Sequence, residues 1–183
     1  MKCKICGMDI NEKNYNYNEA AFLNENSKDH IIYCPFCGAR QEYLSEENEI
    51  INLDSSLFDE KTLKILDHAV KLELFNGDFY NIAAGMAKDV KVKGVFEALS
   101  KIEIFHARIH QRLGGFKEVP NLSKVSYERY NTDSALLELA KQKEEHAVSY
   151  YEKYKHEVNN KELSEIFEAL AGVEKEHIIL VEE

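Results

Sequence analysis

The 183-residue chain has no tryptophan, only two prolines and no cysteine beyond residue 37. It also lacks an apolar run of about 18 residues, the length that a membrane-spanning helix needs, so we expect no membrane association. The first ten residues include two cysteines but no apolar stretch of the kind found in secretory signals. We therefore expect a cytoplasmic protein, because thiols stay reduced in that compartment.

Basic side chains are outnumbered by acidic ones. Lys and Arg number 23 against 33 Asp and Glu, which gives a net charge of −10. Nucleic-acid binding without sequence preference rests on cationic contacts to phosphates, so we predict no nucleic-acid partner. Apolar residues make up 44% of the chain and charged residues 31%, which indicates a soluble, helix-rich protein with a packed core.

The composition of the chain changes near residue 55. Residues 1–45 hold all four cysteines and many asparagines, residues 46–56 are polar and acidic, and residues 57–183 show helical periodicity. We predict a small metal-knuckle domain over 1–45, a linker over 46–56 and an all-α four-helix bundle over 57–183. The predicted helices are 57–88 with Ser55 or Ser56 as N-cap, 92–113 ending at Gly114-Gly115, 134–158 with Thr132 or Asp133 as N-cap, and 162–183.

The strongest pattern is an internal repeat with an offset of 71 positions. It carries Phe96-Glu97-Ala98-Leu99 onto Phe167-Glu168-Ala169-Leu170, and the turn residue Asp89 onto Asn160. Each copy of the repeat is therefore predicted to form one helical hairpin. The same offset pairs the residues with chemical potential: Glu73 with Glu144, Tyr80 with Tyr151, Glu103 with Glu174, and His106 with His177.

Helix geometry predicts that the acids and histidines of each hairpin meet. Glu73 and Glu103 lie on opposite arms of the first hairpin, each about 15 residues or roughly 22 Å from the turn, so they return to the same height. His106 shares a helix face with Glu103, because residues three apart are neighbours on a helix. Two packed hairpins would thus bring four carboxylates and two imidazoles together, which is the ligand set of di-iron and di-manganese carboxylate proteins.

The electrostatics of this cluster favour bound cations. Four buried carboxylates at close range repel one another and lack solvation, whereas two divalent cations cancel their charge. Oxygen ligands mixed with imidazole favour two iron ions, with manganese as an alternative. Tyr80 and Tyr151, seven residues after Glu73 and Glu144, are either hydrogen-bond donors to these carboxylates or plain core aromatics. The other nearby histidines, His110 and His146, are expected at exposed or rim positions.

Two Cys-x-x-Cys-Gly knuckles, 3–7 and 34–38, contain all the cysteines. Each knuckle can supply two thiolates to a tetrahedral site, and disulfides or a thioredoxin-like redox pair fit the pattern less well. The intervening segment is rich in asparagine, which favours a zinc-ribbon-like structural site over a rubredoxin-like iron site. We predict one zinc or iron ion held by Cys3, Cys6, Cys34 and Cys37.

These motifs resemble the rubrerythrin family, whose members join a ferritin-like di-iron bundle to a rubredoxin-like domain. The resemblance of the bundle covers residues 57–183 and is carried by the two Glu/Glu-x-x-His sets. It implies a homodimer that reduces hydrogen peroxide to water with electrons from a donor protein, and it implies Glu103 and Glu174 as bridging ligands. The full set of iron ligands that it implies is Glu73, Glu103, His106, Glu144, Glu174 and His177.

The chain departs from the family pattern in two respects. Its cysteine region precedes the bundle, as in a reverse-ordered subgroup. Typical members also carry an additional glutamate one turn after the third-helix ligand, where this chain has Ala147. A one-residue bulge in the helix would let Glu145 serve as that ligand, with Gln142 as its partner one turn earlier.

The leading interpretation is a di-iron oxidoreductase of the peroxidase type, in which Tyr80 and Tyr151 assist proton transfer. Two other functions stay open. One is a ferroxidase or iron-handling protein that uses dioxygen, which suits a six-ligand set. The other is a non-enzymatic interaction module, in which a zinc ribbon is mounted on a helical scaffold.

Overall fold

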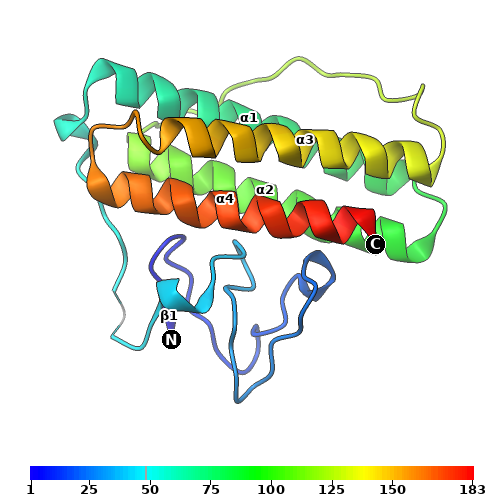
Figure 1. Cartoon of the computed structure of the whole chain (residues 1–183), viewed down its shortest axis with the longest axis horizontal. Coiled ribbons are helices and arrows are strands. Elements are labelled where there is room, and N and C mark those ends of the chain that lie inside the picture. The colour runs from blue at the N-terminus through cyan, green and yellow to red at the C-terminus, as the bar shows by residue number, and fades with distance from the viewer. Residues whose placement is uncertain (48) are drawn as a thin grey trace.

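The computed structural model describes residues 1–47 and 49–183. Four helices run side by side in it (Figure 1) and pack as two hairpins, α1 with α2 and α3 with α4. The predicted all-α four-helix bundle is therefore confirmed. The bounds of the helices are α1 (Glu60–Met86), α2 (Val90–Gly114), α3 (Asp133–Tyr154) and α4 (Lys161–Glu182).

Each helix begins after a residue whose side-chain oxygen accepts a hydrogen bond from the backbone of the first turn. Thr132 caps α3, as predicted, and α2 is followed by its C-cap Gly115, whose φ of 66° is left-handed. The prediction of Ser55 or Ser56 as a helix cap is wrong, because these residues form a separate 3-10 turn, η3 (Ser55–Leu57), and α1 begins later. The remaining caps are Asp59, Asp89 and Asn160.

The N-terminal region contains little regular structure. Strands β1 (Lys2–Cys3) and β2 (Leu44–Ser45) pair antiparallel, and η1 (Glu19–Ala21) and η2 (Gln41–Tyr43) are short 3-10 turns. Buried Asn26 organises the long segment between the knuckles. Its side-chain amide donates to the carbonyls of Tyr15 and Tyr33 and accepts from the backbone N–H of Ile32. Asparagine thus supplies hydrogen bonds that regular structure would otherwise provide.

The N-terminal region packs along the side of the bundle formed by α2 and α4, whereas the connection between α2 and α3 passes on the opposite side (Figure 1). Ile5 and Phe36 share one hydrophobic core with Leu113 and Leu170 of these helices. The Arg112 guanidinium of α2 donates to the carbonyl oxygens of Ile5 and Ile51 at 2.6 and 2.8 Å. The division into 1–45, 46–56 and 57–183 stays a prediction.

None of the helices in the described ranges is both long enough and apolar enough to cross a membrane.

Gly38, where the second knuckle contacts α4, and Gly172, inside α4, should respond differently to substitution. Gly38 has a φ of 74°, and a Cβ atom there would lie 2.5 Å from Val173 Cγ1. We expect Gly38→Ala to lower the free energy of unfolding by about 1–3 kcal/mol. Gly172, inside α4, has open space around it, so Gly172→Ala should be neutral or raise that free energy by up to about 1 kcal/mol.

Urea unfolding of the two full-length variants, followed by circular dichroism, measures both effects. Equal stability of the two variants would show that the knuckle does not press against α4 as described.

Candidate metal centres

The structure brings together all six residues that the repeat singled out. Glu73 lies on α1, Glu103 and His106 on α2, Glu144 on α3, and Glu174 and His177 on α4. Every one of the six is completely buried. The four helices thus each contribute one carboxylate to the interior of the bundle, and α2 and α4 each add one imidazole.

The six residues form two groups whose ligand atoms lie within 4.8 Å of one another. Both groups contain Glu103 and Glu174. Each group then has one further glutamate and one histidine of its own, Glu73 with His106 and Glu144 with His177. Two ions placed in these groups would share two carboxylates, as in bridged two-metal sites.

The ring nitrogens of both histidines face the carboxylates. His106 Nδ1 lies 2.9 Å from Glu174 Oε1, and the two atoms approach without making a hydrogen bond. His177 Nδ1 donates to Glu174 Oε2 at 3.0 Å and lies 3.7 Å from Glu103 and Glu144 oxygens. Such convergence of nitrogen and oxygen atoms is the geometry of side chains that could bind a common cation.

Buried polar atoms of this cluster that lack hydrogen-bond partners show whether metal ions fit the site. Within the described residues, both carboxylate oxygens of Glu103 lack a hydrogen-bond partner, although they are buried. So do one oxygen of each of the other three glutamates and Nδ1 of His106. Buried polar groups are rarely left without partners, and cations would satisfy all of these atoms. The residues therefore fit a two-metal centre.

The pKa values of the metal-free cluster show the same charge imbalance. Burial, followed by the repulsion of the Glu174 carboxylate, holds the pKa of Glu103 and of Glu144 well above the usual range. Burial lowers the pKa of His106, but Glu174 and Glu73 outweigh it and raise the value to about 9. Burial raises the pKa of Glu174, but the two histidines outweigh it and leave the value low. Without cations the cluster must hold protons.

Two tyrosines cross between the hairpins to reach these carboxylates. The Tyr80 hydroxyl of α1 donates to Glu144 of α3, and the Tyr151 hydroxyl of α3 donates to Glu73 of α1. Both phenols are completely buried, and burial raises the pKa of each well above 10. The tyrosines are therefore neutral donors that fix the orientation of two of the four glutamates.

His110 is a residue that the sequence prediction misplaced. It was expected near solvent but is completely buried, and its Nε2 lies 2.7 Å from the Tyr151 hydroxyl. Because that hydroxyl donates to Glu73, the imidazole must donate to the phenol oxygen. Burial lowers the pKa of His110 to about 3, so the ring is neutral. Its spacing of four residues from His106 could have indicated a shared buried face. His146 is exposed, as predicted.

The structure contradicts the helix-bulge alternative for the third-helix ligand. Glu144 points inward, while Glu145 and Gln142 are exposed, and the Gln142 side chain donates to Glu138. Ala147 is completely buried. No carboxylate therefore replaces the additional glutamate at this turn of α3.

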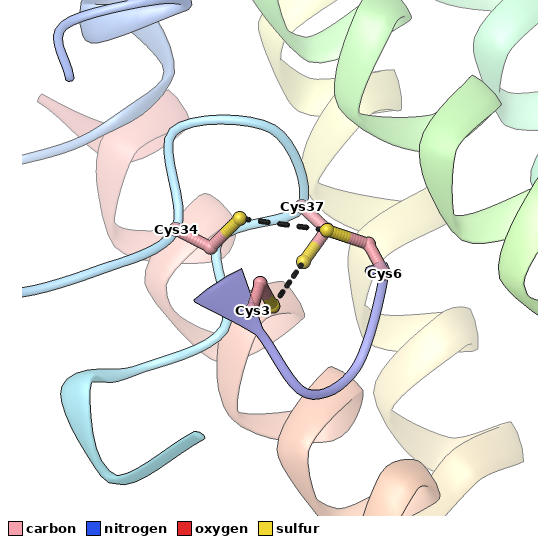
Figure 2. Close-up of side chains that lie close together, drawn as sticks. All are labelled: Cys3, Cys6, Cys34 and Cys37. Carbon is pink, nitrogen blue, oxygen red and sulfur yellow. Dashed lines mark hydrogen bonds between the residues drawn. The ribbon is translucent and has the colours of Figure 1, made fainter. Parts of the chain in front are cut away.

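The four cysteines form a second cluster, in which their sulfur atoms turn toward one another (Figure 2). All are free thiols, and the Sγ atoms of Cys3 and Cys37 lie 3.7 Å apart, those of Cys6 and Cys34 3.6 Å apart. Metal–sulfur bonds of about 2.3 Å in a tetrahedron place sulfur atoms about 3.8 Å apart. The geometry thus fits one tetrahedral metal ion and excludes the disulfide alternative for this arrangement.

One hydrogen bond joins the two clusters. His106 Nε2 lies 2.9 Å from the carbonyl oxygen of Cys37, so the imidazole donates to the backbone of a cysteine in the thiol cluster. Its other nitrogen faces the carboxylates. A buried histidine with metal-ligand geometry commonly donates its second N–H in this way, which fixes the ring orientation and the tautomer.

The metal-free protein should lose stability as the pH rises from 6.5 to 9. Glu103, Glu144 and His106 have higher pKa values in the folded state than in the unfolded chain, so the folded state binds more protons and is weakened as they leave. One such proton changes the free energy of unfolding by about 1.4 kcal/mol per pH unit, or Tm by roughly 3–5 °C. The lowered pKa of His110 opposes this trend only below pH 6.5.

Thermal unfolding of the chelator-treated protein across this range measures the slope. Reloading with Mn²⁺ should flatten it, since the cations replace the protons, and Glu144→Gln should reduce it in the metal-free protein. A flat or rising curve for the metal-free protein would contradict the expectation.

Comparison with known proteins agrees with this architecture. The family model of the ferritin-like domain matches residues 61–182, which include helices α2 to α4 and all but the first residue of α1. No curated protein and no solved structure matches the chain. The matched range covers well over half of the sequence and contains all six residues of the carboxylate and histidine cluster. The chain therefore belongs to the family of proteins with a ferritin-like domain.

Proposed function

We propose that this protein is a di-iron oxidoreductase that reduces hydrogen peroxide to water. The observation that carries the proposal is the pair of overlapping ligand groups, which share Glu103 and Glu174 and are otherwise matched. Shared carboxylates hold two ions close together, which suits a reaction that needs two electrons at one place. Carboxylate and imidazole ligands favour iron, with manganese as the alternative.

The reaction consumes one peroxide molecule, two electrons and two protons, and it yields two water molecules. A reduced iron pair would supply the two electrons, one from each ion, and Lewis acidity at the O–O bond. An electron-donor protein is proposed as the source that restores the reduced state. The ligands themselves lie in a site that excludes bulk water, because all six are completely buried.

The chain's own contribution is orientation and proton supply. Tyr80 and Tyr151 hold Glu144 and Glu73 in place through their hydroxyl protons. The two hydroxyl groups place these protons at Glu144 and Glu73, and His110 can return one to Tyr151 from Nε2. We propose both tyrosines as groups that assist proton transfer to the reacting oxygen atoms.

The cysteine cluster is proposed to hold one zinc or iron ion. Zinc would make it a structural site, because zinc has no redox chemistry. With iron, the Cys37 carbonyl and His106 would provide a short connection between the two sites. Metal analysis and the visible absorption of oxidised iron–thiolate bonds distinguish the two occupants in the purified protein.

Ferroxidase activity is the second candidate, and one observation favours it. The third helix offers Ala147, not a carboxylate, one turn after Glu144, so the ligand set remains at six. A ferroxidase would use dioxygen in preference to peroxide.

A homodimer is the proposed assembly for the peroxidase, and chromatography with light scattering tests it.

Rapid mixing of the reduced, iron-loaded protein with each oxidant separates these functions. We expect hydrogen peroxide to oxidise the iron at least tenfold faster than dioxygen at equal concentration, as followed by absorbance in a stopped-flow instrument. A variant that combines Glu103→Ala with Glu174→Ala should bind no iron pair and show neither reaction. An equal or faster reaction with dioxygen would favour the ferroxidase instead.

Removal of either tyrosine hydroxyl should slow the peroxide reaction without emptying the site. We expect Tyr80→Phe and Tyr151→Phe to lower the rate by about 10–100-fold, while two iron ions per chain remain bound. Tyr154→Phe, on α3 but away from the carboxylates, is the matched control and should keep the rate. Wild-type rates in both of the first two variants would leave the tyrosines as core aromatics only.

A further inference from the structure

A cavity of about 370 Å³ lies between α1, α3 and the connection that joins α2 to α3. Its volume falls within the range of small-molecule sites, about 300–1,000 Å³. Apolar and aromatic side chains form most of its wall, contributed in part by Leu72, Phe75, Tyr127, Tyr130 and Leu139. The connection passes along the side of the bundle opposite the N-terminal region (Figure 1), so the cysteine cluster does not take part in this cavity.

The charged side chains that line the cavity have one sign. Arg129 and Lys143 line it, whereas the lining residues within 1–47 and 49–183 include neither Asp nor Glu. The chain as a whole has 33 acidic residues against 23 Lys and Arg, so a wall with bases and no acids runs against the average composition. Such a wall attracts an anion.

Lys143 stands at this wall without a carboxylate partner. In the part of the chain that the structure describes, no carboxylate lies within 4.0 Å of its Nζ. The ammonium instead lies 3.9 Å from the centre of the Phe75 ring and 3.5 Å from Asn76 Oδ1. Contact with an aromatic face and one long hydrogen bond leave most of its donor capacity free.

Asn76 supplies a second free donor beside it. The side chain is only 1% exposed, and its Nδ2 has no hydrogen-bond partner among the described residues. The amide oxygen faces Lys143, which can only donate, so the NH₂ group is the unsatisfied end. A buried amide without a partner costs stability, and an acceptor bound in the cavity would remove that cost.

We propose that this cavity binds a small monocarboxylate with an apolar body. The carboxylate accepts from Lys143 Nζ, Asn76 offers the unpartnered Nδ2 donor of the neighbouring amide, and the apolar body occupies the aromatic wall. Arg129 adds positive charge at the cavity wall. The site requires neither metal centre, so binding there can be tested independently of the proposed peroxide chemistry.

Calorimetric titration of the purified full-length protein with 3-phenylpropionate tests the assignment. We expect a Kd below about 1 mM for a ligand of this size. The neutral isostere 3-phenylpropan-1-ol and the cation 3-phenylpropan-1-amine should bind at least tenfold more weakly, because both lack the anionic head. Absence of heat up to 10-fold above the expected Kd, or equal binding of the alcohol, would overturn the proposal.

Variants locate the binding in the cavity. Lys143→Met should weaken 3-phenylpropionate binding at least tenfold, whereas Lys153→Met, the same change at an exposed position of α3, should keep the affinity within twofold. Asn76→Leu should weaken binding about as much, and circular dichroism checks that it folds. If Asn76→Leu does not fold, Ser126→Trp, which fills the cavity from the connection, replaces it. Equal affinity of the two lysine variants would refute the site.

Discussion

The burial of four carboxylates at one level of a helical bundle is the constraint on which the rest of this structure depends. Burial and mutual repulsion raise the pKa of Glu103 and Glu144, so the metal-free interior must hold protons. Two divalent cations balance four negative charges and satisfy the carboxylate oxygens that the protein leaves without partners. The crossed tyrosine hydroxyls and the hydrogen bond from His106 to Cys37 then fix the orientation of Glu73, Glu144 and His106.

The cluster of six candidate ligands is nearly symmetric, but its surroundings are not. The repeat places equivalent acids, histidines and tyrosines on the two hairpins, whereas the N-terminal region covers only one side of the bundle. His106 therefore finds a backbone acceptor in Cys37, while Nε2 of His177 has none among the described residues. His110 supports Tyr151, whereas the repeat places Val181 at the equivalent position near Tyr80. The two halves of the centre consequently differ in their hydrogen bonding, although they have the same ligands.

Sequence spacing could predict the ligands because a helix converts spacing into position. Glu103 and His106 lie three residues apart and therefore share one face of a helix. The repeat then identifies the equivalent residues of the second hairpin. The cap of α1 was missed because several polar residues precede the helix, and only the structure shows that Asp59 accepts the hydrogen bond. His110 had a signal in its spacing from His106, but a polar residue type suggested exposure.

The cavity beside Lys143 could not be predicted, because part of its wall comes from an irregular connection. Residues 116–131 have no periodicity from which their path could be derived, yet Tyr127 and Tyr130 close the site against α1 and α3. Asn76 likewise has the sequence pattern of an ordinary polar residue in a helix, and only the structure shows that it is buried. Sequence patterns therefore specify what each helix presents to the core, whereas tertiary packing decides what becomes enclosed.

The repeat also relates Asn76 to Ala147, the position one turn after Glu144, and neither residue is a carboxylate. The anionic members of the six candidate ligands are therefore the four glutamates. Under the proposed function, two ferrous ions leave this site neutral and two ferric ions leave it with two positive charges. A fifth carboxylate would offset part of that excess and stabilise the oxidised pair. Because this chain has Ala147 in place of a fifth carboxylate, we expect the site to favour the reduced pair, which is the state that reacts with peroxide.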